Sequence, residues 1–97
     1  MKLDFAHADF WLLKGQEHSH KNELDSAIDS YRQSIRLEAR NAKMQPTRSA
    51  QIRAMGTQAM HNLACAYELQ QRFDIGKKWF EIALCINEDK FAWSEHD

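Results

Sequence analysis

The sequence predicts an all-α domain built from two antiparallel helical hairpins, and three observations support this prediction. One proline and three glycines among 97 residues favour long helices over a turn-rich β-sandwich. Apolar residues recur at spacings of three and four in four successive segments, as on the buried face of an amphipathic helix. An internal repeat at an offset of 49 residues relates the first two segments to the last two.

Four helices are expected, at about 6–20, 23–42, 47–70 and 73–87. Asn22 is expected to end the first helix, since Asn tolerates the left-handed conformation that follows a helix. Pro46 separates the second helix from the third, because proline disfavours helix at the residue before it. Gln71 and Arg72 separate the third helix from the fourth, which is expected to end at residues 87–89.

The repeat keeps the size of each side chain: large residues fall on large ones, and small residues on small ones. Close helix packing needs small residues where backbones approach and large residues in the holes beside them. A repeated order of small and large residues therefore indicates a repeated helical hairpin. The matched pairs are Trp11 with Met60, Gly15 with Ala64, Leu24 with Phe73, Ala27 with Gly76, Tyr31 with Phe80, Ser34 with Ala83, Ile35 with Leu84 and Leu37 with Ile86.

Length and charge limit the class of protein. The chain fits one small domain, and its net charge of -1 comes from mixed acidic and basic residues, which argues against a nucleic-acid or membrane-surface partner. The N-terminus does not resemble a signal peptide, and no apolar stretch approaches the length of a membrane span. Cys65 and Cys85 are expected to be free thiols, which favours the cytoplasm or another reducing compartment.

The two hairpins resemble the tetratricopeptide repeat (TPR) family, whose signature is W-x2-L-G-x2-Y followed by A-x3-F. In the first copy, Lys14 replaces the signature leucine and His18 replaces the tyrosine. The second copy has Met60 in place of the tryptophan, and neither copy has the final proline. The residues that fit are Trp11, Gly15, Ala27 and Tyr31 in the first copy, and Leu63, Ala64, Tyr67, Gly76, Phe80 and Ala83 in the second.

The resemblance places both repeats in a single domain over residues 1–90, of the α-solenoid type. Repeat one spans about 8–41 and repeat two about 57–90, which leaves an insertion at 42–56. The family spacing is 34 residues, so 15 are extra here. Ile52 and Met55 continue the apolar stripe of the third helix backward, so that helix is expected to be extended by two or more turns. Residues 91–97 form a C-terminal tail or capping segment.

The resemblance implies a protein–protein interaction module that binds a peptide or helix of a partner in a groove lined by the first helix of each pair. For any one of the candidate residues, the alternative is a solvated position on an exposed helix face. The candidates are Asp9, Leu12, Gln16 and His20 from the first helix, and Gln58, His61, Asn62, Cys65, Glu68 and Leu69 from the third.

One TPR subclass, the co-chaperone adaptors, clamps a C-terminal carboxylate with lysine and asparagine side chains. Leu12 and Gln16 stand at the positions of the first helix, and only Asn62 matches. The main alternative to groove binding is a structural subunit of a multi-protein complex, held by its outer helix faces. Trp79 is expected on a less buried face, either as an interface anchor or packed against the tail. Two repeats are fewer than the number usually needed for stability, so self-association is also possible.

No catalytic role and no cofactor are expected, since no Gly-rich phosphate loop, GxSxG or HExxH motif is present. His61 and Cys65 share a helix face, but the sequence supplies no oxyanion hole for a nucleophilic pair. His18 and His20 point to opposite sides of their helix and cannot share one metal ion. His20 could join His61 and Cys65 as a third ligand across the groove. His18 is expected to pack against the neighbouring helix.

Overall fold

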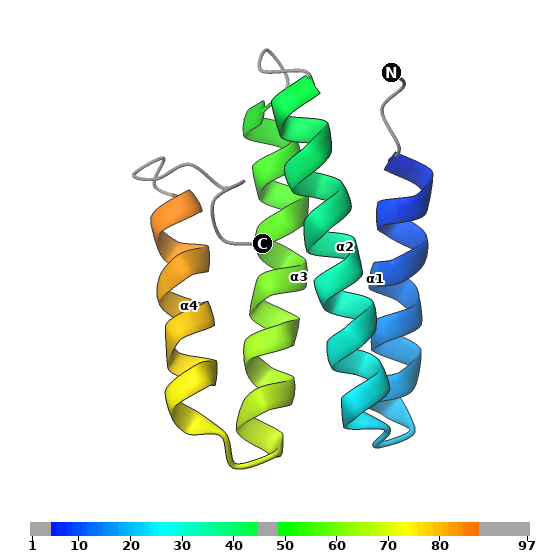
Figure 1. The fold of residues 1–97 in the computed structure, drawn as a ribbon, viewed down its shortest axis with the longest axis vertical. Helices are drawn as coiled ribbons and strands as arrows, with labels where there is room; N and C mark the ends of the chain where they lie inside the picture. The colour runs from blue at the N-terminus through cyan, green and yellow to red at the C-terminus, as the bar shows by residue number, and fades with distance from the viewer. Residues whose placement is uncertain (1–4, 45–48, 88–97) are drawn as a thin grey trace.

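The computed structural model describes residues 5–44 and 49–87, with side chains for 7–41 and 56–84. It has four helices: α1 (Phe5–His20), α2 (Leu24–Met44), α3 (Ser49–Leu69) and α4 (Phe73–Asn87). Each helix runs antiparallel to the next, and the turns within the two hairpins lie at the same end of the molecule (Figure 1). The predicted all-α fold is confirmed, and the expected helix bounds agree to within about two residues.

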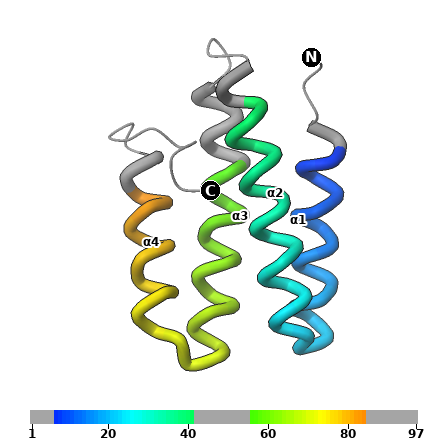
Figure 2. Tube along the Cα trace, in the orientation of Figure 1, coloured from blue at the N-terminus to red at the C-terminus, as the bar shows by residue number. Residues whose placement is uncertain are grey.

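The helices follow one another as in a solenoid. α2 packs against both α1 and α3, and α3 packs against both α2 and α4, whereas α1 barely reaches α3. The Cα trace shows the same order of neighbours (Figure 2). Within the described part of the chain, α1 and α4 are therefore the two ends of the stack.

Both hairpins turn through the same backbone motif. Asn22 and Gln71, which are 49 residues apart, have positive φ angles of 60° and 63°. In the first turn Glu23 N–H donates to the His18 carbonyl at 2.8 Å, and in the second Arg72 N–H donates to the Tyr67 carbonyl at 2.9 Å. These are the six-to-one bonds of the Schellman motif, so the repeat seen in the sequence extends to the turn geometry.

The expected extension of the third helix is confirmed, because α3 begins at Ser49, upstream of the second repeat. α2 is also long, continuing to Met44, so both helices have 21 residues, against 16 in α1 and 15 in α4. The expected break at Pro46, the end of the last helix at 88–89 and the tail at 91–97 lie outside the described residues.

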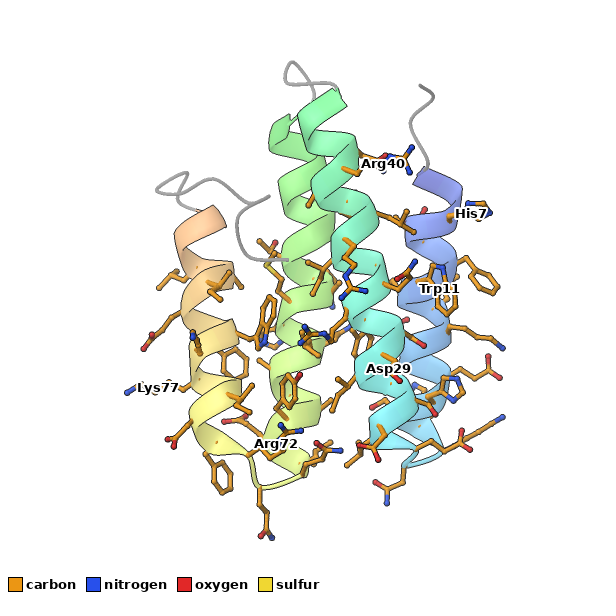
Figure 3. All side chains as sticks on the ribbon, viewed as in Figure 1. His7, Trp11, Asp29, Arg40, Arg72 and Lys77 are labelled. Atoms are coloured by element: carbon orange, nitrogen blue, oxygen red, sulfur yellow. The ribbon has the colours of Figure 1, made fainter. Side chains whose placement is uncertain are left out.

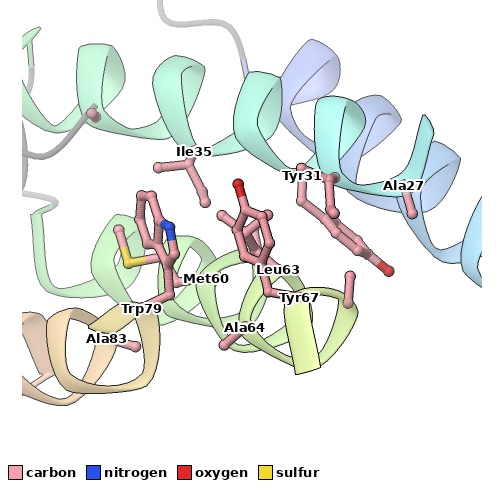
Figure 4. Close-up of a cluster of buried hydrophobic side chains, with 13 residues drawn as sticks. Ala27, Tyr31, Ile35, Met60, Leu63, Ala64, Tyr67, Trp79 and Ala83 are labelled. Atoms are coloured by element: carbon pink, nitrogen blue, oxygen red, sulfur yellow. The ribbon is translucent and has the colours of Figure 1, made fainter. Parts of the chain in front are cut away.

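The core lies between α2, α3 and α4. Ile35, Met60 and Leu63 are its largest fully buried apolar side chains, and Tyr67 and Trp79 belong to the same cluster (Figure 4). The expectation that Trp79 lies on a less buried face is wrong, since its side chain is only 9% exposed. Trp79 occupies the position that Ser30 holds in the first hairpin, and its indole fills the core instead of marking an interface.

The seam between α1 and α2 is polar. α2 buries a line of hydrophilic side chains at spacings of three and four, and the Oγ of Ser34 donates to the Ala8 carbonyl at 2.9 Å. Burial, with a smaller contribution from Asp9, raises the pKa of Glu38 to about 7. The buried hydrophilic residues are Ser30, Ser34, Glu38 and Asn41.

Candidate protein-binding groove

A pocket with a volume of about 360 Å³ opens between α1 and α3. α1 contributes Gln16, Ser19 and His20, which lie three and four residues apart and so share one helix face. α3 contributes Asn62 and Cys65 by the same spacing. Tyr31 reaches the pocket from α2 and is only 3% exposed, so its ring forms part of the pocket wall.

The structure brings together four of the residues predicted for the groove: Gln16, His20, Asn62 and Cys65. Ser19 was not predicted, although its position three residues after Gln16 places it on the same face. Tyr31 was predicted only as a residue of the repeat signature. Burial raises the pKa of the Tyr31 hydroxyl, and a hydrogen bond with Ser19 acts in the opposite direction. The two unpredicted residues are thus linked to each other within the pocket.

Two further predicted residues lie beside the pocket on α3. The Nε2 of Gln58 donates to the Oδ1 of Asn62 at 3.3 Å, which extends the polar line by one helical turn. His61 lies toward α4 instead, with its ring edge-on to Phe80 at 5.1 Å between centroids. The predicted residues of α3 therefore divide between the pocket, which faces α1, and the side of α3 that faces α4.

The remaining four predicted residues do not line the pocket. Asp9 is exposed one helical turn or more away, near Glu38, and Leu12 packs partly buried against the core. Glu68 is exposed on the α4 side, where its Cγ lies near Gly76, and Leu69 is 63% exposed at the end of α3.

The groove has no lysine or arginine among its described candidates. The pocket residues are neutral amides, a hydroxyl, a phenol, an imidazole and a thiol, and the charged candidates, Asp9 and Glu68, are both acidic. Arg32 lies elsewhere, where its Nη1 donates to the Tyr67 hydroxyl at 3.2 Å. The residues that line the pocket therefore include no lysine, arginine, aspartate or glutamate.

The His61 and Cys65 pair is not arranged as an activated nucleophile. The Cys65 Sγ lies 3.9 Å from the His61 Nδ1, and Cys65 is a free cysteine. Burial, and to a lesser extent Glu68, raises the pKa of the Cys65 thiol, whereas catalytic cysteines need a lowered pKa. The described residues contain no group of three or more His, Cys, Asp or Glu that could hold a metal ion, so His20 does not complete such a set.

His18 makes a contact across the first turn that the sequence did not predict. Its Nδ1 lies 2.9 Å from the Glu23 Oε1 across the first turn, and 29% of its side chain is exposed. This contact, chiefly the hydrogen bond, holds the pKa of Glu23 below its usual value. None of the described helices is long and apolar enough to cross a membrane.

Comparison with known proteins supports the resemblance drawn from the sequence. The model of the tetratricopeptide repeat family matches residues 8–41, the same range that was assigned to the first hairpin. No curated protein and no solved structure matches the chain. This match covers 34 of the 97 residues, and the four helices are consistent with repeats of this family, whose members generally serve as protein–protein interaction modules.

Proposed function

We propose that the chain is a non-catalytic module that binds a peptide or helix of another protein in the groove between α1 and α3. The pocket formed by Gln16, Ser19 and His20 with Asn62 and Cys65 is the observation that carries this proposal. Its volume of about 360 Å³ falls in the range of small ligand pockets, which is enough for one or two peptide side chains.

The chemistry of the pocket suits a peptide backbone. The amides of Gln16 and Asn62 each offer donors and an acceptor, so they can pair with both the N–H and the C=O groups of an extended chain. The hydroxyl of Ser19, three residues after Gln16 on α1, adds a further hydrogen-bond donor or acceptor to the pocket. Such convergent polar groups supply orientation and specificity, while the buried wall of Tyr31 supplies apolar surface.

The charge of the groove favours a neutral or basic partner segment. An acidic C-terminal peptide would find no lysine or arginine among the pocket residues to pair with its carboxylates. A co-chaperone role of the carboxylate-clamping type is therefore disfavoured, since Leu12 stands where that subclass has a charged lysine and Gln16 replaces its asparagine.

A structural role within a larger complex is the second candidate. It is favoured by two exposed apolar side chains on α1, Phe10 at 49% and Leu13 at 64%. The burial of Trp79 removes the residue that was expected to anchor such an outer face.

Peptides selected by the full-length chain from a random phage-displayed library provide the test. Gln16→Ala combined with Asn62→Ala is expected to weaken their binding about tenfold, equivalent to about 1.4 kcal/mol. Gln33→Ala, which removes an amide of α2 outside the pocket, is the matched control and should leave the affinity unchanged. Binding that survives the groove pair but fails after Phe10→Glu with Leu13→Glu would favour the structural candidate instead.

A further inference from the structure

The internal repeat allows the outer face of α4 to be compared with the same face of α2. α3 covers that face of α2, so Ile28, Tyr31 and Ile35 are only 7%, 3% and 1% exposed. The equivalent residues of α4, 49 positions later, are Lys77, Phe80 and Leu84. Leu84 is 57% exposed because no described helix covers this side of α4, and Phe80, whose ring meets His61 of α3, is only half-buried.

Four residues of α4 form a continuous stripe, called here the α4 seam: Phe73, Lys77, Phe80 and Leu84. Their spacings of four, three and four are those of the contact positions in a coiled coil. Phe73 is 59% exposed, and Lys77 points away from the rest of the molecule (Figure 3). The α4 seam thus combines the spacing of a helix-packing surface with large exposed apolar groups.

The opposite end of the stack does not match this seam. α4 approaches the side of α3 that carries Ala64, since a Cβ added to Gly76 would lie 3.1 Å from the Ala64 carbonyl oxygen. The residues on the other side of α3 therefore face α2. Those residues are Gly56, Ala59, Leu63 and Ala66, which are buried and mostly small enough for close helix approach.

Their equivalents on the free side of α1 are large or charged: His7, Phe10, Lys14 and Glu17. α1 therefore lacks the small residues with which α3 receives α2. Head-to-tail stacking of the α4 seam of one copy on α1 of the next is disfavoured.

We infer that two copies of this chain associate through their α4 seams, with the two α4 helices antiparallel about a two-fold axis. The same surface then serves both copies, as in most symmetric dimers. An axis near residue 79 sets Phe73 against Leu84 of the second copy and brings Lys77 within reach of the second copy's Glu81. The two-fold axis makes the ion pair between Lys77 and Glu81 form twice, once from each copy. The aliphatic part of each Lys77 side chain then covers a Phe80 ring.

The size of the seam sets the strength of this dimer. α4 has 15 residues, so its length is about 22 Å. One helix face of this length buries well under the roughly 800 Å² per partner of a standard stable interface. The dimer is therefore weak, with a dissociation constant of about 10–100 μM.

Sedimentation equilibrium of the full-length chain, from about 1 to about 500 μM, tests the inference. The wild-type chain is expected to shift from monomer to dimer across this range. Phe73→Glu with Leu84→Glu should leave a monomer throughout, with circular dichroism showing that the helices are retained. The equally exposed pair on α1, changed as Phe10→Glu with Leu13→Glu, is the matched control and should still dimerise.

Charge-reversal variants distinguish this two-fold arrangement from non-specific hydrophobic association. Lys77→Glu places two glutamates in each contact and should weaken the dimer at least about tenfold. Lys77→Glu with Glu81→Lys restores opposite charges and should recover the wild-type dissociation constant. A wild-type chain that stays monomeric at every concentration would overturn the inference. So would a dimer that is lost in Phe10→Glu with Leu13→Glu, or one whose dissociation constant is unchanged by Lys77→Glu.

Discussion

Among single residues, Glu38 has the most unusual setting, because its carboxyl group is buried between helices. Its side chain is 2% exposed, and its Oε2 has no hydrogen-bond partner among the described residues. Burial, then the Asp9 carboxylate, raises its pKa to about 7. The folded state consequently favours the protonated form of Glu38.

The stability of the wild-type chain should fall as pH rises through the range 4.5 to 7. Because the folded pKa lies above the unfolded value, the folded state binds more protons than the unfolded state in this window, so the free energy of unfolding decreases with pH. Glu38→Gln removes this dependence, and it should stabilise the chain by about 1–3 kcal/mol at pH 8 while changing little at pH 4. Urea unfolding of both proteins at the two pH values checks this, and an equal difference at both would contradict it.

Gly15 and Gly76 occupy similar helix-crossing positions but should differ in their tolerance of alanine. A Cβ at Gly15 would collide with the Tyr31 ring, which is held in the core, whereas at Gly76 it would meet the flexible Glu68 side chain at 3.0 Å and the Ala64 carbonyl at 3.1 Å. Gly15→Ala should destabilise the fold by about 1–3 kcal/mol, and Gly76→Ala by less than about 1 kcal/mol. Thermal unfolding measures the difference, and equal losses would contradict the packing described for Gly15.

Sequence reasoning was least accurate for individual side chains. Trp79 was expected on a less buried face because the repeat signature contains its neighbour Phe80 instead. The second hairpin instead buries the indole where the first has Ser30, and no local pattern encodes that exchange of volumes. His18 likewise depends on a partner five residues away, Glu23, which a comparison of helix faces overlooks.

At the scale of elements, the two Schellman turns differ in how well their residues suit a positive φ. Asn22 tolerates this conformation, whereas Gln71, at φ 63°, is strained by its Cβ. Gln71→Gly should therefore stabilise the chain by about 0.5–1 kcal/mol, and Asn22→Gly should have a smaller effect. Chemical denaturation of both variants tests the comparison; a loss of stability in Gln71→Gly would mean that its side chain supports the turn.

The helices themselves could be predicted closely from the sequence, because apolar periodicity and turn residues are local signals. The signal at Asn22 was sufficient to locate the first turn, and the repeat then located the second. The groove could be predicted only in part. Helical spacing identified four pocket residues, but Tyr31 comes from another helix, and its approach depends on the absence of a side chain at Gly15.

For the molecule as a whole, the stack should be uneven in stability. α3 is covered on two sides by α2 and α4 and contributes more residues to the described apolar core than any other helix, whereas α1 packs mainly on α2, across a polar seam. Local opening occurs where buried apolar contacts are few. Amide hydrogen exchange is expected to be faster in the middle of α1 than in the middle of α3, and equal protection in both helices would contradict this view of the seam.

The central claim is that the groove between α1 and α3 receives a segment of a partner protein. Nitrogen–proton NMR spectra, recorded while a library-selected peptide is titrated into the labelled chain, test it most directly. The account predicts that the largest shift changes fall on Gln16, Ser19, His20, Asn62 and Cys65. Shift changes centred on α4 or on the outer face of α1, with the pocket amides unmoved, would contradict it.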